Sequence, residues 1–210
     1  ATVYKRSVEV MVREMGRCAA LGIPHLITHL GSHLGEGVAA GRERLSDGIA
    51  RALAAGPEGV VILLENTAGT KNSMGGTFPE IRDVMDAIDA PGRIGICLDT
   101  CHAYAAGYDL ASPEAVAATL DAFETAIGFA HLFCVHCNDC KGPLGGALDR
   151  HEHIGLGSIG DAGFAALLSR PEIRRLPLIC ETPVDARRND AENIRHIRWL
   201  AGPEPPQKKR

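Results

Sequence analysis

The sequence predicts an α/β fold in which helices flank a parallel sheet, built from about five βα units in one domain. Three observations indicate this fold. The chain has 210 residues and is 45% apolar, which is typical of a single globular domain. Its strand-like runs are apolar throughout rather than alternating, as in sheets that are covered by helices on both faces. Helix-like and strand-like segments also alternate along the chain, which favours βα units.

Each predicted element rests on a local pattern. Apolar residues at three- and four-residue spacing predict a first helix over residues 3–21, which Gly22 ends. Pro113 opens a later helix, since proline is favoured in the first helical turn. The predicted strands are 25–29, 60–65, 94–99, 132–136 and 176–181, and the predicted helices after the first are about 42–54, 78–88, 113–127, 161–169 and 190–201. The domain is expected to cover residues 1–202, and the Pro-rich, charged residues 203–210 a disordered tail.

Composition excludes several classes of protein. The net charge of −4 argues against a non-specific nucleic-acid binder, and an aromatic content of 4% argues against a base-stacking platform. No apolar run approaches the 18 residues of a membrane-spanning helix, and the first residues lack the apolar core of a signal peptide. Seven cysteines in a chain of this size indicate free thiols in a reducing compartment, so a cytoplasmic protein is expected.

An ionisable residue ends every one of the five predicted strands. These residues are 34 to 45 residues apart, about one βα unit each: His29, Glu65, Asp99, His136 and Glu181. A single such residue would only cap a strand, but the ends of parallel strands converge on one face, so five would share a small volume. Three carboxylates at close range repel one another unless a cation neutralises them. The pattern therefore predicts divalent metals bound by nitrogen and oxygen, which suits zinc, manganese or iron.

Two further pairs extend this set. His102 follows Asp99 by three residues, and Asp149 precedes His151 by two, a spacing that puts both side chains on one side of an extended segment. Together with the strand ends they give eight candidate ligands, which is enough for more than one ion.

Seven segments of the chain resemble endonuclease IV, the zinc-dependent apurinic/apyrimidinic endonuclease family 2. They are Thr28–His33, Leu64–Gly69, Leu98–Ala103, Ala105–Asp109, His136–Asp139, Asp149–His151 and Pro177–Thr182. The likeness runs from about residue 7 to 200. It implies a TIM (β/α)8 barrel with a xylose isomerase-like domain, here reduced to about five βα units because the first three strands of the family are not found.

The resemblance also implies an activity and a set of roles. The family cuts the DNA backbone 5′ to abasic sites in base excision repair, by a metal-activated hydroxide at a centre of up to three zinc ions. Glu65 would bridge the first and second metals, His29 would bind the first, and the first site would lack one ligand in this chain. Glu65 and Glu181 are the expected catalytic residues, and the expected partner is double-stranded DNA with abasic sites, bound by a protein that is monomeric at full length. The second metal would take Asp99, His136 and Glu181, and the third His102, Asp149 and His151.

Two other functions remain open at this stage. A sugar isomerase or epimerase of the xylose-isomerase-like barrels also places Glu, Asp and His at strand ends around one metal, with Glu65 and Glu181 as an acid/base pair. Such an enzyme would have no use for a site made of His102, Asp149 and His151. An inactive fragment is the second alternative. Arg150, between two candidate ligands, is either a DNA phosphate contact or part of a surface salt bridge.

Overall fold

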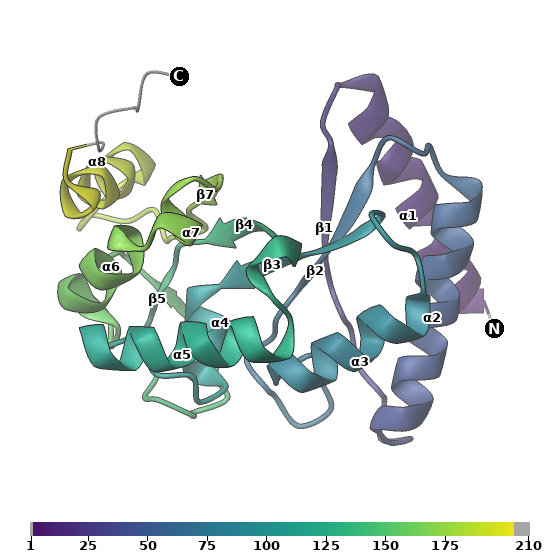
Figure 1. Ribbon diagram of the computed structural model, residues 1–210, viewed down its shortest axis with the longest axis horizontal. Helices are drawn as coiled ribbons and strands as arrows, with labels where there is room; N and C mark the ends of the chain where they lie inside the picture. The colour runs from purple at the N-terminus through teal and green to yellow at the C-terminus, as the bar shows by residue number, and fades with distance from the viewer. Residues whose placement is uncertain (1, 204–210) are drawn as a thin grey trace.

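The computed structural model describes residues 2–203 and contains a five-stranded parallel sheet with helices along its outer side (Figure 1). The strands lie in the order β1 (His25–His29), β2 (Val61–Glu65), β3 (Ile94–Asp99), β4 (Leu132–His136) and β7 (Leu178–Ile179). All four neighbouring pairs are parallel, so the predicted α/β class is confirmed. Of the predicted tail, only Pro203 lies within the described residues.

The helices form a continuous outer layer. They are α1 (Thr2–Ala20), α2 (Val38–Ala55), α3 (Phe78–Ile88), α5 (Pro113–Ala126), α6 (Gly160–Ser169) and α8 (Asp190–Ala201). Each packs against the next in this order, as Figure 1 shows from the purple N-terminal end to the yellow C-terminal end. A sheet that is lined by successive helices on its outside is the arrangement of a (β/α) barrel wall. None of the described helices is long and apolar enough to cross a membrane.

The two faces of the sheet have different surroundings. The outward side chains are buried against the helices in the main core, and they include Ile62, Leu64, Ile96, Leu98 and Val135. The inward side chains form a smaller buried group of Leu63, Cys97 and Cys134, with Ile27, Val61 and Phe133 packed against it. The strands at the two edges, β1 and β7, are only partly buried.

Strand register brings the predicted strand-end residues to one edge of the sheet. His29 pairs with Glu65 on the neighbouring strand, and Asp99 pairs with His136. A bulge shifts the β3–β4 register between Ile96 and Cys97. Because all strands are parallel, their carboxyl ends lie together, and this edge carries the residues that the sequence predicts as candidate ligands.

The segment after β3 was predicted only as a connection, but it forms the short helix α4 (Thr100–Ala105). The carboxylate of Asp99 caps it by accepting the backbone N–H of His102 at 2.7 Å. Six residues are too few for a helical period to be recognised. The segment between the predicted strand 132–136 and the predicted helix 161–169 also contains a small antiparallel hairpin of β5 (Asp139–Cys140) and β6 (His151–Glu152).

Two predicted boundaries were wrong. Helix α2 begins at Val38 rather than near residue 42, because Gly37 has a φ of +93° and ends the preceding turn. The last strand was predicted over 176–181, but β7 has two residues. Pro177 has no backbone N–H to donate, and β7 lies at the edge of the sheet. Two short elements were also not predicted, the 3₁₀ turn η1 (Phe129–His131) and α7 (Pro171–Arg174).

Candidate metal centre

All eight candidate ligands lie at the carboxyl edge of the sheet or in the loops directly above it. Four belong to the strand ends His29, Glu65, Asp99 and His136. His102 lies on α4, Asp149 and His151 come from the loop and hairpin between β4 and α6, and Glu181 lies two residues past β7. Residues more than 150 positions apart in the sequence therefore converge, as predicted. Seven of the eight form two groups, and His29 lies beside Glu65 of the first group.

The first group contains Glu65, Asp99, His136 and Glu181, whose ligand atoms all lie within 4.8 Å of one another. The Nδ1 atom of His136 is 2.9 Å from Glu65 Oε1 and 3.2 Å from Glu181 Oε2. Asp99 and Glu65 are buried, whereas the Glu181 side chain is 48% exposed. Three carboxylates and one imidazole supply four donors, which is enough for one divalent ion. The site would be reached from solvent on the side of the half-exposed Glu181.

The second group contains His102, Asp149 and His151. Asp149 Oδ1 lies 3.2 Å from His102 Nε2 and 3.5 Å from His151 Nε2, and the two Nε2 atoms are 3.4 Å apart. His102 is buried, His151 is largely buried and Asp149 is half-exposed. Two imidazoles and a carboxylate at these distances match the three protein ligands of a zinc site that keeps a position open.

His29 is attached to the first group through a single carboxylate. Its Nε2 atom lies 3.1 Å from Glu65 Oε2, and its side chain is 52% exposed. The second oxygen of Glu65 faces His136, so this carboxylate lies between two imidazoles. Glu65 is thus placed to bridge two ions. Among the described residues, only His102 is a further donor within ligand distance of the pair His29 and Glu65.

The imidazoles and carboxylates of the first group shift one another's pKa values. Burial raises the pKa of Glu65, but the adjacent His136 and His29 more than offset it and hold this pKa at about 2. Burial lowers the pKa of His136, and Glu65 beside it raises the value to about 9. Burial also raises the pKa of Asp99. The imidazoles therefore favour the charged form of Glu65, and a divalent cation at the same atoms would act in the same direction.

Two asparagines that the sequence reasoning missed hold the first group in place. Asn66 forms a double hydrogen bond with the backbone of Asp99, donating to its carbonyl at 3.0 Å and accepting its N–H at 2.7 Å. Asn138 donates to Asp99 Oδ2 at 2.6 Å and accepts the Glu181 N–H at 2.7 Å. Asn66 comes one residue after β2 and Asn138 two residues after β4, and that position was the only signal available in the sequence.

The ring orientations of the second group are fixed by backbone carbonyls. His102 Nδ1–H donates to the Asn66 carbonyl at 3.0 Å, and His151 Nδ1–H donates to the Glu181 carbonyl at 3.0 Å. Each bond leaves Nε2 of that ring available toward Asp149. Metal-binding histidines are commonly held in this way, through the nitrogen that does not bind the ion.

Arg150 is exposed and lies between Asp149 and His151 in the chain. Its guanidinium donates to the Asp149 carbonyl at 2.7 Å, and it forms no ion pair within residues 2–203. The charge of Arg150 is therefore available to an anion beside the second group.

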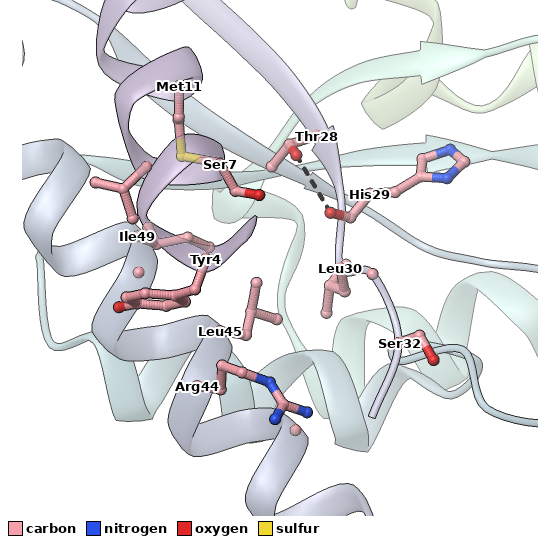
Figure 2. A pocket seen from close by; sticks show the side chains of 14 residues that line it. Tyr4, Ser7, Met11, Thr28, His29, Leu30, Ser32, Arg44, Leu45 and Ile49 are labelled. Carbon is pink, nitrogen blue, oxygen red and sulfur yellow. Dashed lines mark hydrogen bonds between the residues drawn. The ribbon is translucent and has the colours of Figure 1, made fainter. Parts of the chain in front are cut away.

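A pocket on the other side of β1 lies away from this chemistry. It is formed by α1, α2 and β1, and Figure 2 shows its lining side chains, among them Tyr4, Met11 and Leu45. His29 contributes to the wall, but its imidazole points away from the other labelled side chains. A second, smaller cavity is lined by His29, His102 and Asp149, and it opens onto the metal-ligand candidates.

Comparison with known proteins agrees with the geometry. A family model described as "Xylose isomerase-like TIM barrel" matches residues 1–201. The chain is 56% identical to "Probable endonuclease 4" of Methanoculleus marisnigri, covering 96% of this chain and 72% of that protein. It is 49% identical to "Probable endonuclease 4" of Methanosphaerula palustris, covering 96% of this chain and 71% of that protein.

Solved structures give the same result. Endonuclease IV from Thermus thermophilus superposes with a TM-score of 0.81 at 34% identity, over 95% of this chain and 70% of that one. A D-tagatose 3-epimerase-like protein superposes with a TM-score of 0.70 at 18% identity, over 93% of this chain and 67% of that one, which shows a shared fold. The fold and the similarity to these relatives together show that the chain belongs to the endonuclease IV family of xylose isomerase-like TIM barrels.

Proposed function

We propose that this chain is a DNA-repair endonuclease that hydrolyses the phosphodiester 5′ to abasic sites in double-stranded DNA, with zinc as its metal. The convergence of eight histidine and carboxylate side chains on one edge of the sheet carries this proposal. The relatives named endonuclease 4 support the choice of reaction. In this proposal the second zinc is held by Glu65, Asp99, His136 and Glu181, and the third by His102, Asp149 and His151.

The donor chemistry fits zinc. Imidazole nitrogen and carboxylate oxygen are ordinary zinc ligands, and the two groups supply four and three of them. Glu65, with one oxygen toward His29 and the other toward His136, is proposed to bridge the first and second ions. When bound, zinc would supply an activated water at neutral pH and would offset negative charge on the phosphate and the leaving oxygen.

Other residues of the chain hold the candidate ligands in position. Asn66 and Asn138 hold Asp99 from both sides, so the buried carboxylate cannot turn away from the group. Glu181 is fixed through its backbone N–H and carbonyl, while its half-exposed carboxylate lies where a large substrate has access. Arg150 is proposed to contact a DNA phosphate, because its charge is exposed and unpaired among the described residues.

The group of His102, Asp149 and His151 is the observation that favours this function over a one-metal sugar isomerase. An isomerase needs one metal and an acid/base pair, which Glu65 and Glu181 could supply without the second group. The epimerase-like structures share the fold at low sequence identity, and so they support no particular reaction.

The test is cleavage of a duplex that contains one abasic site. Glu181→Gln removes one charged oxygen ligand and is expected to abolish cleavage while duplex binding stays largely intact. Glu58→Gln is the matched control, because this exposed glutamate lies before β2, at the opposite end of the strand from Glu65, and belongs to none of the ligand groups; it should cleave at the wild-type rate. Full cleavage by Glu181→Gln would remove this residue from the site. Ketose–aldose conversion by the wild type, without cleavage, would replace the endonuclease by the isomerase.

A further inference from the structure

Two cysteines lie directly beneath the proposed zinc ligands, on the inward face of the sheet. Cys97 precedes Asp99 by two residues on β3, and Cys134 precedes His136 by two residues on β4. Alternate residues of a strand face the same side, so the thiols form the next layer down from the carboxylate group. The two cysteines are also register partners across the β3–β4 pair.

The two sulfur atoms and one ring nitrogen of His136 all lie within 4.8 Å of one another. Cys97 is fully buried and Cys134 is 3% exposed. Their neighbours on this face are apolar: Leu63 is buried with them, and Ile27, Val61 and Phe133 pack against the group. The carboxylate group lies above the thiols, and His136 belongs to both groups.

Two thiols and an imidazole form a donor set that differs in kind from the groups above it. Thiolate sulfur prefers soft ions such as cuprous copper and cadmium, whereas carboxylates suit harder ions. We propose that Cys97, Cys134 and His136 form a separate site for a soft, thiophilic metal ion beneath the proposed zinc centre. Binding replaces the proton on each sulfur by a metal–sulfur bond and releases both protons to solvent.

His136 couples this site to the zinc centre. Its Nδ1 atom lies within 3.2 Å of both Glu65 and Glu181, which are proposed to share a zinc ion with it. In this proposal an ion that is held by the two sulfurs takes the ring nitrogen of the same imidazole. A soft ion in the lower site therefore competes with zinc for one of its four ligands, and the thiol pair provides a route by which thiophilic metals displace the second zinc.

The test uses cadmium alone, added to the reduced, zinc-free chain of 210 residues. Sulfur ligation is followed by the ultraviolet charge-transfer absorption of cadmium thiolates, which does not depend on nuclease activity. In the wild type this absorption should rise until the pair of Cys97 and Cys134 has bound one cadmium ion. Cys97→Ala and Cys134→Ala should each lose the part of the signal that arises from this pair, together with one tight cadmium ion.

Two variants control for other thiols. Cys137→Ala removes a fully buried thiol that belongs to none of the metal-ligand groups, and it should behave as the wild type. Cys101 has Asp99 and His151 within ligand distance, so Cys101→Ala removes this second possible contributor, and the signal of the Cys97–Cys134 pair should persist there.

Unchanged cadmium absorption in both Cys97→Ala and Cys134→Ala would overturn the proposal. If either variant fails to fold by circular dichroism, cadmium NMR of Cys101→Ala decides the question. A resonance in the range of two-thiolate coordination supports the site. Resonances only in the range of nitrogen and oxygen coordination refute it.

Discussion

Replacing Asp139 by asparagine tests how the loop behind the metal-ligand hairpin is held. The carboxylate of Asp139 lies at β5 and accepts several backbone N–H groups. Oδ2 accepts from Gly155, Gly157 and Gly160 at 2.9–3.2 Å, and Oδ1 accepts from Ile159 and Cys140 at 2.9 and 2.8 Å. Burial raises the pKa of Asp139, and these N–H groups act in the opposite direction by stabilising its charged form. One side chain therefore organises the segment between β6 and α6.

The magnitude follows from the number of donors that lose their acceptor. In Asp139→Asn the remaining oxygen can keep the three contacts of Oδ2, but the amide NH2 then faces the N–H groups of Ile159 and Cys140. Each unsatisfied buried donor costs roughly 1–3 kcal/mol. We expect the free energy of unfolding to fall by about 3 kcal/mol, which for a domain of this size lowers the Tm by about 10 °C.

Urea unfolding followed by circular dichroism measures this change. Asp109→Asn is the matched control, because its carboxylate accepts a single backbone N–H, that of Ala111, at 2.9 Å. The control should lose less than about 1 kcal/mol. Equal losses in the two variants would refute the reasoning, since the number of backbone donors would then not determine the effect.

Three further results are expected. Removing metal with EDTA should lower the Tm clearly, because Glu65 and Asp99 are buried carboxylates that bound cations would neutralise, and an unchanged Tm in protein shown to be stripped would contradict the metal centre. Gly95→Ala should cost about 1–3 kcal/mol, because its new Cβ would overlap the Phe133 ring, and Phe133→Leu should recover part of that loss in a double-mutant cycle. Arg150→Ala should weaken binding of an abasic duplex and reduce the slope of log Kd against log salt by about 1, with kcat unchanged; an unaltered slope would place Arg150 outside the DNA interface.

The sheet and its active edge could be predicted because the strands are buried on both faces. Such strands appear as unbroken apolar runs, and the residue that ends each run is then conspicuous, as with Glu65 after Val61–Leu64. Parallel pairing then places these end residues side by side, because it aligns His29 with Glu65 and Asp99 with His136. The same logic failed at β7, where an edge position and Pro177 shorten the strand to two residues.

The supporting residues could not be predicted, because their roles depend on contacts between distant segments. Asn66 holds Asp99 across 33 positions of sequence, and Asn138 links Asp99 to Glu181 across two strands. Helix α4 has only six residues, and it begins directly after Asp99, which caps it. Because Asp99 also ends β3, the sequence pattern shows the strand end and hides the helix start. The local sequence pattern does not show which distant residue each of these side chains bonds to.

The amount of zinc that the purified chain retains tests the central claim most directly. Within the described residues, Glu65, Asp99, His136 and Glu181 supply one full donor set, and His102, Asp149 and His151 supply another. His29 shares Glu65 with the first of these, and the one further donor near the pair, His102, already belongs to the second set, so two protein ligands remain and bind zinc weakly compared with three or four. Metal analysis by mass spectrometry after exhaustive dialysis should therefore find about two zinc ions per chain. Chain that is folded by circular dichroism but retains no zinc would contradict the proposed centre.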